Sequence, residues 1–231
     1  MPRRLSFFAF VTFCIAALFG CAGKAPEAPP PKVEVAKVPE PPADPRPVIV
    51  CFGDSITAGY GLEAGKTYPD VLQRLIDGGG YQYRVVNLGV SGDTTQAALE
   101  RVNSAVELKS KIAIVELGGN DGLRGIPLNR SRDNLQQIVV RLKSTGSKVL
   151  LAGITLPPNY GRDYIRGFEQ MYASVAKGSA DSFMPFVLDG VWNKKGMMQE
   201  DGIHPTAPGA ELLARNVFKF LQPILEKPAP K

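Results

Sequence analysis

Short apolar runs rich in β-branched residues alternate with segments of helical spacing over most of the chain. The runs lie at 48–52, 85–88, 112–117 and 149–152, with a fifth candidate at 186–188. The helical spacing occurs at 71–76, 97–102, 135–142, 164–176 and 212–225. Nearly continuous apolar strands are typical of a parallel sheet covered on both faces. The alternation therefore predicts a three-layer α/β domain with a central five-stranded parallel sheet and right-handed crossovers.

The N-terminal segment has a different pattern. A basic Pro2-Arg3-Arg4 stretch precedes an apolar stretch at 5–19, which has the length of a signal peptide rather than of a membrane span. It ends in Leu18-Phe19-Gly20-Cys21, which resembles a bacterial lipobox with Cys21 as the lipidated residue. We expect residues 1–20 to be a lipoprotein signal peptide. A plain signal peptide cut nearby is the alternative.

Residues 21–47 are rich in Pro, Ala, Glu and Lys and have too little apolar surface to offset the entropy of ordering. We expect an extended tether here, a folded domain at 48–227 and a disordered tail at 228–231. Ala22 follows the cysteine, and in lipoproteins this pattern implies a lipid anchor in the outer membrane, facing the periplasm or the exterior. Without lipidation, we expect a periplasmic protein.

Composition excludes several classes of protein. The 231 residues include 27 Lys and Arg against 22 Asp and Glu, a net charge of +5, but the basic residues are spread along the chain. A nucleic-acid partner is therefore not expected. Of three cysteines, Cys14 and Cys21 lie in the leader region, which excludes a disulfide framework. Cys51 lies in an apolar run and is expected to be a buried small hydrophobic residue.

Polar, glycine-rich segments follow three of the predicted strands. They are Gly53-Asp54-Ser55-Ile56-Thr57-Ala58-Gly59-Tyr60, Asn87-Leu88-Gly89-Val90-Ser91-Gly92-Asp93-Thr94 and Gly118-Gly119-Asn120-Asp121-Gly122. Ligands of open parallel sheets bind outside the carboxyl ends of the strands. Glycine allows the backbone to turn tightly and to approach a ligand. The sequence therefore predicts a binding site formed by these three segments.

Ser55 follows the first strand, where its hydroxyl reaches the sheet edge and its own N–H lies near a developing oxyanion. The only histidine, His204, stands three residues after Asp201. Asp201 can hold one ring nitrogen while the other faces the serine, which is the arrangement of a catalytic triad. The residues allow a second interpretation, in which Ser55 lies in a helix-capping turn, His204 lies in an exposed loop, and the other two segments are ordinary turns or helix starts.

These segments together resemble the conserved blocks of the GDSL, or SGNH, hydrolases. The resemblance rests on Gly53-Asp54-Ser55, Asn87 to Gly92, Gly118-Gly119-Asn120-Asp121 and Asp201-x-x-His204-Pro205, and spans about residues 48–225. The chain is most similar to the bacterial thioesterase I, lysophospholipase and arylesterase group. Ile56 stands where many members have leucine, a conservative change. The absence of a Gly-x-Ser-x-Gly elbow favours the flavodoxin-like SGNH fold over the α/β-hydrolase fold.

The resemblance implies a role for several residues. Ser55 is the expected nucleophile, and His204 with Asp201 completes the triad. The expected oxyanion donors are the N–H groups of Ser55 and Gly92 and the side-chain amide of Asn120. The resemblance also places five residues at the substrate: Asp54, Leu123, Ile126, Pro157 and Tyr160. The segment at 122–126 resembles the family's mobile acyl-covering loop, although an ordinary surface loop has the same composition.

The sequence therefore predicts a serine esterase that acts on small-molecule acyl esters, either lysophospholipids or small acyl and aryl esters, with thioesters as a further class. We expect no metal or cofactor, because no cluster of metal-binding residues is apparent, and we expect a monomer. An extracytoplasmic location disfavours acyl-CoA as the substrate. A carbohydrate O-deacetylase of the cell wall is the alternative enzyme. A non-catalytic surface lipoprotein would be expected to lack a triad residue, and all three are present.

Overall fold

The computed structural model describes residues 44–226, and its centre is a five-stranded sheet. The strands are β1 Val48–Gly53, β2 Arg84–Gly89, β3 Ile112–Glu116, β4 Lys148–Ala152 and β5 Ser182–Met184. Their order is β2-β1-β3-β4-β5, and all neighbours pair in parallel. Every residue of β1 and β3 is buried, as expected for strands covered on both faces. All carboxyl ends of the strands therefore lie at one edge, where the polar segments follow.

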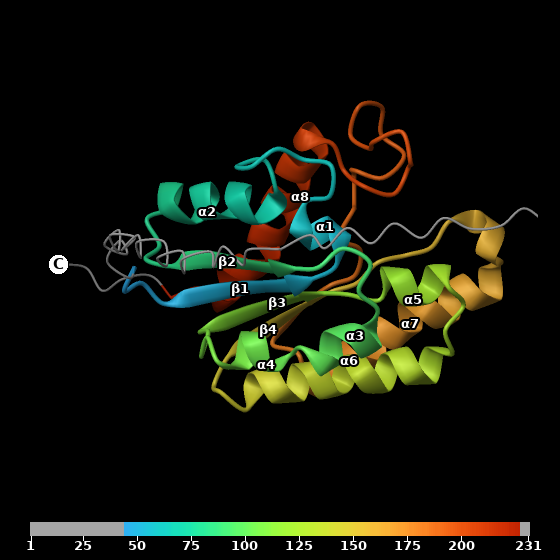
Figure 1. Cartoon of the computed structure of the whole chain (residues 1–231), viewed down its shortest axis with the longest axis horizontal. Helices are drawn as coiled ribbons and strands as arrows, with labels where there is room; N and C mark the ends of the chain where they lie inside the picture. Colours follow the sequence, from blue (N-terminus) through green and yellow to red (C-terminus); the bar gives the residue numbers. More distant parts are fainter. Residues whose placement is uncertain (1–43, 227–231) are drawn as a thin grey trace, which may run out of the picture. The chain divides into compact units, whose positions relative to one another are not determined.

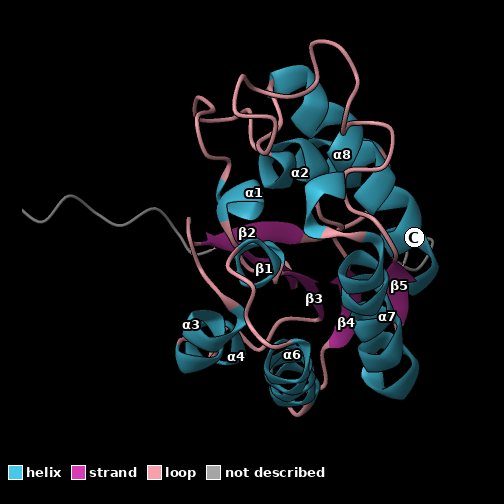
Figure 2. Cartoon of the chain, turned by 90° about the vertical axis from the view of Figure 1, so that its right-hand side faces the viewer, coloured by secondary structure: helices cyan, strands magenta, loops and turns pink. Residues whose placement is uncertain are grey.

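Helices cover both faces of the sheet (Figures 1 and 2). On one face lie α1 Ser55–Ala58, α2 Tyr68–Gly78 and α8 Ala207–Leu221. On the other lie α3 Thr95–Glu100, α4 Asn103–Val106, α6 Leu128–Lys143 and α7 Arg162–Ser179. The short helix α5 Gly119–Leu123 follows β3, and two 3₁₀ turns lie at Pro158–Tyr160 and Gln222–Ile224. The predicted three-layer α/β fold is confirmed.

The fifth strand was predicted at the wrong place. The apolar run 186–188 lies after β5, and Pro185 separates the two. Proline has no N–H to donate to a ladder, so the strand ends there. Val187 and Leu188 are buried all the same, and the N–H of Val187 donates to the carbonyl of Gly153 at 2.8 Å. The run is apolar because it packs against the carboxyl end of β4, and not because it belongs to the sheet.

The helical segments were predicted with shifted ends. The spacing at 97–102 overlaps α3, which begins and ends two residues earlier, and α4 follows it as a separate short helix. Helix α8 begins five residues before the predicted start at 212 and ends four residues before the predicted end at 225. Thr206 caps α8 by accepting the N–H of Gly209, and Pro208 stands in the first turn. These starting signals precede the apolar pattern on which the prediction was based.

The predicted leader, Cys21, most of the tether and the C-terminal tail lie outside the described residues. Of the tether, only residues 44–47 are described, and Arg46 pairs with Asp44 and, at 2.9 Å, with Asp77 of α2. Within residues 44–226, no helix is long and apolar enough to cross a membrane. Cys51 is fully buried, as predicted, and burial raises the pKa of its thiol to about 12.

Candidate active site

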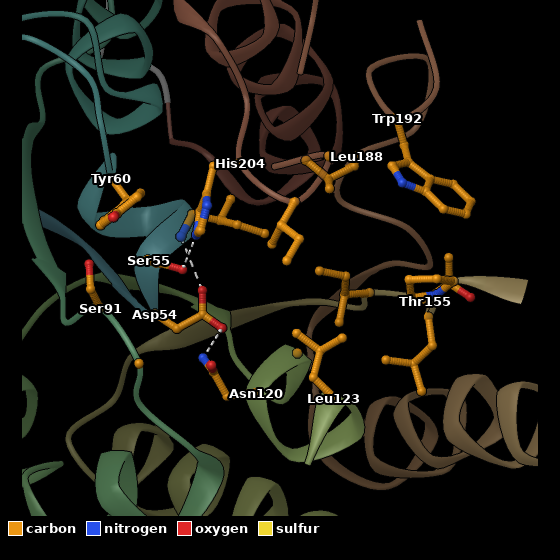
Figure 3. A pocket seen from close by; sticks show the side chains of 18 of the residues that line it. Asp54, Ser55, Tyr60, Ser91, Asn120, Leu123, Thr155, Leu188, Trp192 and His204 are labelled. Carbon is orange, nitrogen blue, oxygen red and sulfur yellow. Dashed lines mark hydrogen bonds between the residues drawn. The ribbon is translucent and has the colours of Figure 1, made fainter. Parts of the chain in front are cut away.

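Ser55 is the first residue of α1, directly after β1 (Figure 3). The side chain of Asp54 caps this helix by accepting the N–H of Ile56 at 3.1 Å. Gly53 makes the tight approach possible, because a Cβ at this position would lie only 2.0 Å from Oγ1 of Thr57. Gly59 ends the helix in the left-handed region, with φ +80°. The sequence Gly-Asp-Ser therefore presents the serine on a rigid, single-turn helix at the sheet edge.

His204 links the serine to an aspartate. Its Nε2 lies 2.8 Å from Oγ of Ser55, and its Nδ1 lies 2.7 Å from Oδ2 of Asp201. The other oxygen of Asp201 accepts the backbone N–H groups of Ile203 and His204 at 2.8 and 3.0 Å, which fixes the carboxylate. Burial acts to raise the pKa of Asp201, but these hydrogen bonds outweigh it and lower the pKa. The Tyr60 ring packs beside the imidazole, with centroids 4.6 Å apart.

The segments after β2 and β3 meet the serine from the other side. Gly92 has a φ of +85°, which favours glycine, and lines the same cavity as Ser55. Asn120 lies in the first turn of α5, and its amide nitrogen donates to the carbonyl of Asp93 at 2.9 Å and to Oδ2 of Asp54 at 3.3 Å. The strand ends thus bring together two groups of the kind that stabilise an oxyanion.

Asp54, which directly precedes Ser55, and Glu116, the last residue of β3, form a buried acidic pair. Asp54 is 2% exposed and Glu116 is 1% exposed. Burial raises the pKa of Asp54 to about 6. Burial, together with the neighbouring charge of Asp54, raises the pKa of Glu116 well above its ordinary value. Burial therefore disfavours a state in which both carboxyl groups are ionised.

The cavity beside Ser55 has a volume of about 250 Å³ and is mainly apolar. Figure 3 shows Asp54, Asn120 and His204 around Ser55, whereas Leu188, Thr155 and Trp192 lie farther from it. Most of the apolar lining comes from α5 and from the segments after β4 and β5: Leu123, Ile154, Leu156, Pro157, Phe186, Leu188 and Trp192. Ile56 and Ile203 add to it beside Ser55 and His204. Such a cavity can hold an apolar acyl or aryl group with its carbonyl at the serine.

The structure brings most of the predicted site residues together. Those that line the cavity are Asp54, Ser55, Gly92, Asn120, Leu123, Pro157 and His204, and Asp201 lies behind the histidine. Ile126 and Tyr160, which were predicted to bind substrate, do not line it. The hydroxyl of Tyr160 instead donates to the carbonyl of Leu123 at 3.0 Å, and the N–H of Ile126 donates to the carbonyl of Asp121 at 3.0 Å. Both residues support the segment that carries Leu123, part of which is helix α5 rather than loop.

The sequence prediction missed most of the apolar lining. Ile154, Leu156, Leu188 and Trp192 all line the cavity. For Ile154 and Leu156 the available signal was their position directly after the fourth apolar run, at the same sheet edge as Ser55. Within residues 44–226, no group of three or more His, Cys, Asp or Glu side chains is arranged to hold a metal ion.

Residues 51–212 match the model of the GDSL-like lipase/acylhydrolase family. The chain belongs to this family. Esterase TesA of Pseudomonas aeruginosa is 42% identical over 178 residues, which cover 77% of this chain and 89% of that protein. Thioesterase 1/protease 1/lysophospholipase L1 of Escherichia coli K12 is 36% identical over 77% of this chain and 84% of that protein. A crystal structure of TesA superimposes with a TM-score of 0.75 and 42% identity, covering 77% of this chain and 99% of that chain.

Membership gives the site its chemistry. The chain is an esterase of the GDSL type, and its relatives imply small-molecule ester substrates. The residues that line the cavity and the Ser55–His204–Asp201 contacts all lie within the matched region.

Proposed function

We propose that the protein hydrolyses carboxylic esters that carry an apolar acyl or aryl group, lysophospholipids among them, through an acyl-enzyme on Ser55. The observation that supports this most is the chain of contacts from Ser55 to His204 to Asp201 at the end of a mainly apolar cavity. Thioesters carry the same acyl group and form a further substrate class. An acetylated glycan would leave the apolar lining unoccupied, so the cavity favours acyl esters over a carbohydrate O-deacetylase reaction.

In the proposed first step, Oγ of Ser55 attacks the acyl carbonyl carbon while Nε2 of His204 takes the hydroxyl proton. Asp201 stabilises the resulting imidazolium. The carbonyl oxygen becomes an oxyanion, and we assign its donors to the N–H groups of Ser55 and Gly92 and the amide of Asn120. Collapse of the tetrahedral intermediate breaks the bond to the leaving alcohol, which receives the proton from His204.

The second step hydrolyses the acyl-enzyme and regenerates the free hydroxyl of Ser55. Water gives a proton to Nε2 of His204 and attacks the acyl-enzyme carbonyl, and collapse breaks the bond to Oγ of Ser55. The serine oxygen takes back the proton, and a carboxylic acid leaves. The apolar part of the cavity, which includes Leu188 and Trp192, would hold the acyl chain in both steps.

The test is a series of p-nitrophenyl esters from acetyl to palmitoyl, assayed on the wild-type protein and Ser55→Ala. We expect the wild type to prefer acyl chains longer than acetyl and the variant to lose activity on every ester. Equal slow hydrolysis by both proteins would contradict the proposed nucleophile. Activity confined to the acetyl ester would favour the deacetylase.

We also propose that the enzyme is exported and anchored to the outer membrane through a lipid on Cys21. Its support is the basic start, the apolar stretch and the Leu18-Phe19-Gly20-Cys21 segment of the sequence. Radiolabelled palmitate should be incorporated by the wild type and by Cys14→Ser, the matched control, but not by Cys21→Ser. Labelling that persists in Cys21→Ser would exclude this anchor.

A further inference from the structure

Glu116 is a buried acid that the proposed reaction does not use. It is the last residue of β3 and does not line the cavity. It stands opposite Gly53 in the parallel register, and its backbone carbonyl accepts the N–H of Asp54 at 3.2 Å. A carboxyl group that is 1% exposed costs stability unless its polar atoms are satisfied, so its presence beside the nucleophile calls for a physical explanation.

The charges around the pair favour a neutral Glu116. The charged groups that act on Asp54 are Glu116, His204 and Asp93, and the nearby cation Arg101 is bound by Asp93 at 2.6 Å. Tyr68 and Tyr172, from α2 and α7, also face Glu116, and burial raises the pKa of both hydroxyls. Two carboxylates buried together without a cation of their own cannot both ionise at low cost.

The hydrogen bonds show where the proton belongs. Oε2 of Glu116 accepts the hydroxyl of Thr57 at 2.8 Å, whereas Oε1 is buried and receives no N–H or O–H donor from the described residues. A side-chain hydrogen bond between Asp54 and Glu116 acts to lower the pKa of Asp54 and to raise the pKa of Glu116. The opposite directions of these effects correspond to a proton that Glu116 donates to Asp54, and Oε1, which has no other partner among the described residues, is the oxygen left to carry it.

Asp54 in turn holds two parts of the catalytic arrangement. One of its oxygens accepts the N–H of Ile56 and caps the helix that begins with Ser55, and the other accepts the amide of Asn120. The second hydrogen of that amide goes to the carbonyl of Asp93. The contact to Asp54 is the longer of the two, 3.3 Å against 2.9 Å, so it is the one that an ester oxygen can share or replace.

We propose that Glu116 is a positioning residue that acts in its protonated form, donating to Asp54 and thereby fixing the carboxylate that orients the helix of Ser55 and the amide of Asn120. This inference rests on the proposed function, since it assigns Asn120 to the oxyanion. Glu116 itself touches no substrate. It aligns groups that do.

The test compares Glu116→Gln with Glu116→Leu in the full-length protein, with a short-chain p-nitrophenyl ester. A glutamine amide can donate to Asp54 and accept from Thr57, as the neutral acid does. We expect Glu116→Gln to keep kcat within about 3-fold of the wild type. Glu116→Leu should lower kcat by about 10- to 100-fold with little change in KM, which is less than the loss of an oxyanion donor outright.

The comparison of the two variants can overturn the proposal in two ways. If Glu116→Gln loses as much kcat as Glu116→Leu, the ionised form is required. If Glu116→Leu matches the wild type, the residue has no positioning role. Ser55→Ala, assayed in parallel, separates this inference from the proposed function: an inactive Ser55→Ala beside a normal Glu116→Leu rejects the positioning role alone, and an active Ser55→Ala rejects the nucleophile.

A stability control and a pH profile complete the design. Ser147→Ala disrupts the buried contact between Ser147 and Ser110, which precede β4 and β3 at the opposite edge of the sheet. Ser147→Ala should lower Tm without lowering kcat. If it lowered kcat as much as Glu116→Leu does, the loss in Glu116→Leu would be due to stability and not to positioning.

If Glu116→Leu does not fold, the pH profile of kcat provides the test. As pH rises and Glu116 ionises, kcat of the wild type should fall, whereas kcat of Glu116→Gln should not show this decline. Identical alkaline profiles would overturn the proposal.

Discussion

The two sides of the cavity are built in different ways. The polar side, with Ser55, Gly92 and Asn120, follows β1, β2 and β3 and is held from behind by hydrogen bonds at 2.7–3.3 Å. The apolar side lies mainly after β4 and β5 and includes Leu188 and Trp192, whose side chains form no hydrogen bond with the described residues. Directional contacts fail when an atom moves by a fraction of an ångström, whereas apolar packing is non-directional. Changes on the polar side should therefore affect the reaction of every ester, and changes on the apolar side should affect the choice among esters.

The largest effect is expected at His204. His204→Ala removes the group that contacts both Ser55 and Asp201, so the serine loses its base. We expect kcat to fall by at least about 10⁴-fold on all chain lengths, because the members of a triad act as a unit. Steady-state kinetics across the ester series will measure it. A loss restricted to long esters would place His204 in substrate binding instead and would break the contrast between the two sides.

The next largest effect is expected at Asn120. Asn120→Ala removes one oxyanion donor and should lower kcat by about 100- to 1000-fold on every ester, with a small change in KM. The matched control is Asn134→Ala on α6, which removes a half-buried amide that donates to Oγ1 of Thr95, away from the cavity. It should keep the kcat of the wild type. Equal losses in the two variants would mean that the effect arises from folding.

The third prediction concerns the free energy of unfolding, which the buried carboxyl group of Asp54 should lower when it ionises. The pKa of this buried carboxyl is raised to about 6 in the folded state, above its ordinary value of 3.8. A raised acid pKa means that the folded protein binds the proton more tightly, so the free energy of unfolding falls as pH rises from about 4 to about 6. The ionisation should cost on the order of 2 to 3 kcal/mol above that range.

Asp54→Asn cannot ionise, so the variant should lack this pH-dependent loss. Urea unfolding at about pH 4 and about pH 8 should show that Asp54→Asn gains stability relative to the wild type on going to the higher pH, while its kcat is lower. Asp133→Asn, a change at an exposed aspartate of α6, provides the control and should follow the wild type at both pH values. A constant difference between Asp54→Asn and the wild type would show that the carboxyl is not strained by burial.

The same contrast explains what the sequence could predict. Four strands were placed correctly because their runs are rich in apolar and β-branched residues, although only β1 and β3 are fully buried and the edge strand β2 is partly exposed. The polar side followed from the glycine-rich segments at the carboxyl ends of β1, β2 and β3. Glu116 and Asp54 were not predicted as an acidic pair, because their contact depends on the register of β1 against β3. Periodicity does not give register between strands that are far apart in sequence.

The apolar side was harder to predict for a physical reason. Phe186, Val187 and Leu188 resemble a strand in composition, and only Pro185 marks the end of β5 before them. Residues that line an apolar cavity and residues that fill a core share the same side chains. Trp192 lies in a loop with no periodicity, so nothing in its neighbourhood in the sequence indicates that it faces the cavity.

The smallest effect on activity is expected at Trp192, and it tests most directly whether the apolar side of the cavity controls only the choice among esters. Its indole lies far from Ser55 along the cavity and packs edge-on against Phe186, with centroids 6.1 Å apart (Figure 3). Trp192→Ala should lengthen the cavity and raise the ratio of kcat/KM for long over short esters by about 10-fold, the scale of a small change in apolar contact. Its kcat on the acetyl ester should stay within about 2-fold of the wild type, and Trp192→Phe should give a smaller shift in the same direction. Equal losses on all chain lengths would mean that the apolar side also aligns the reacting groups, and the division between the two sides would then be wrong.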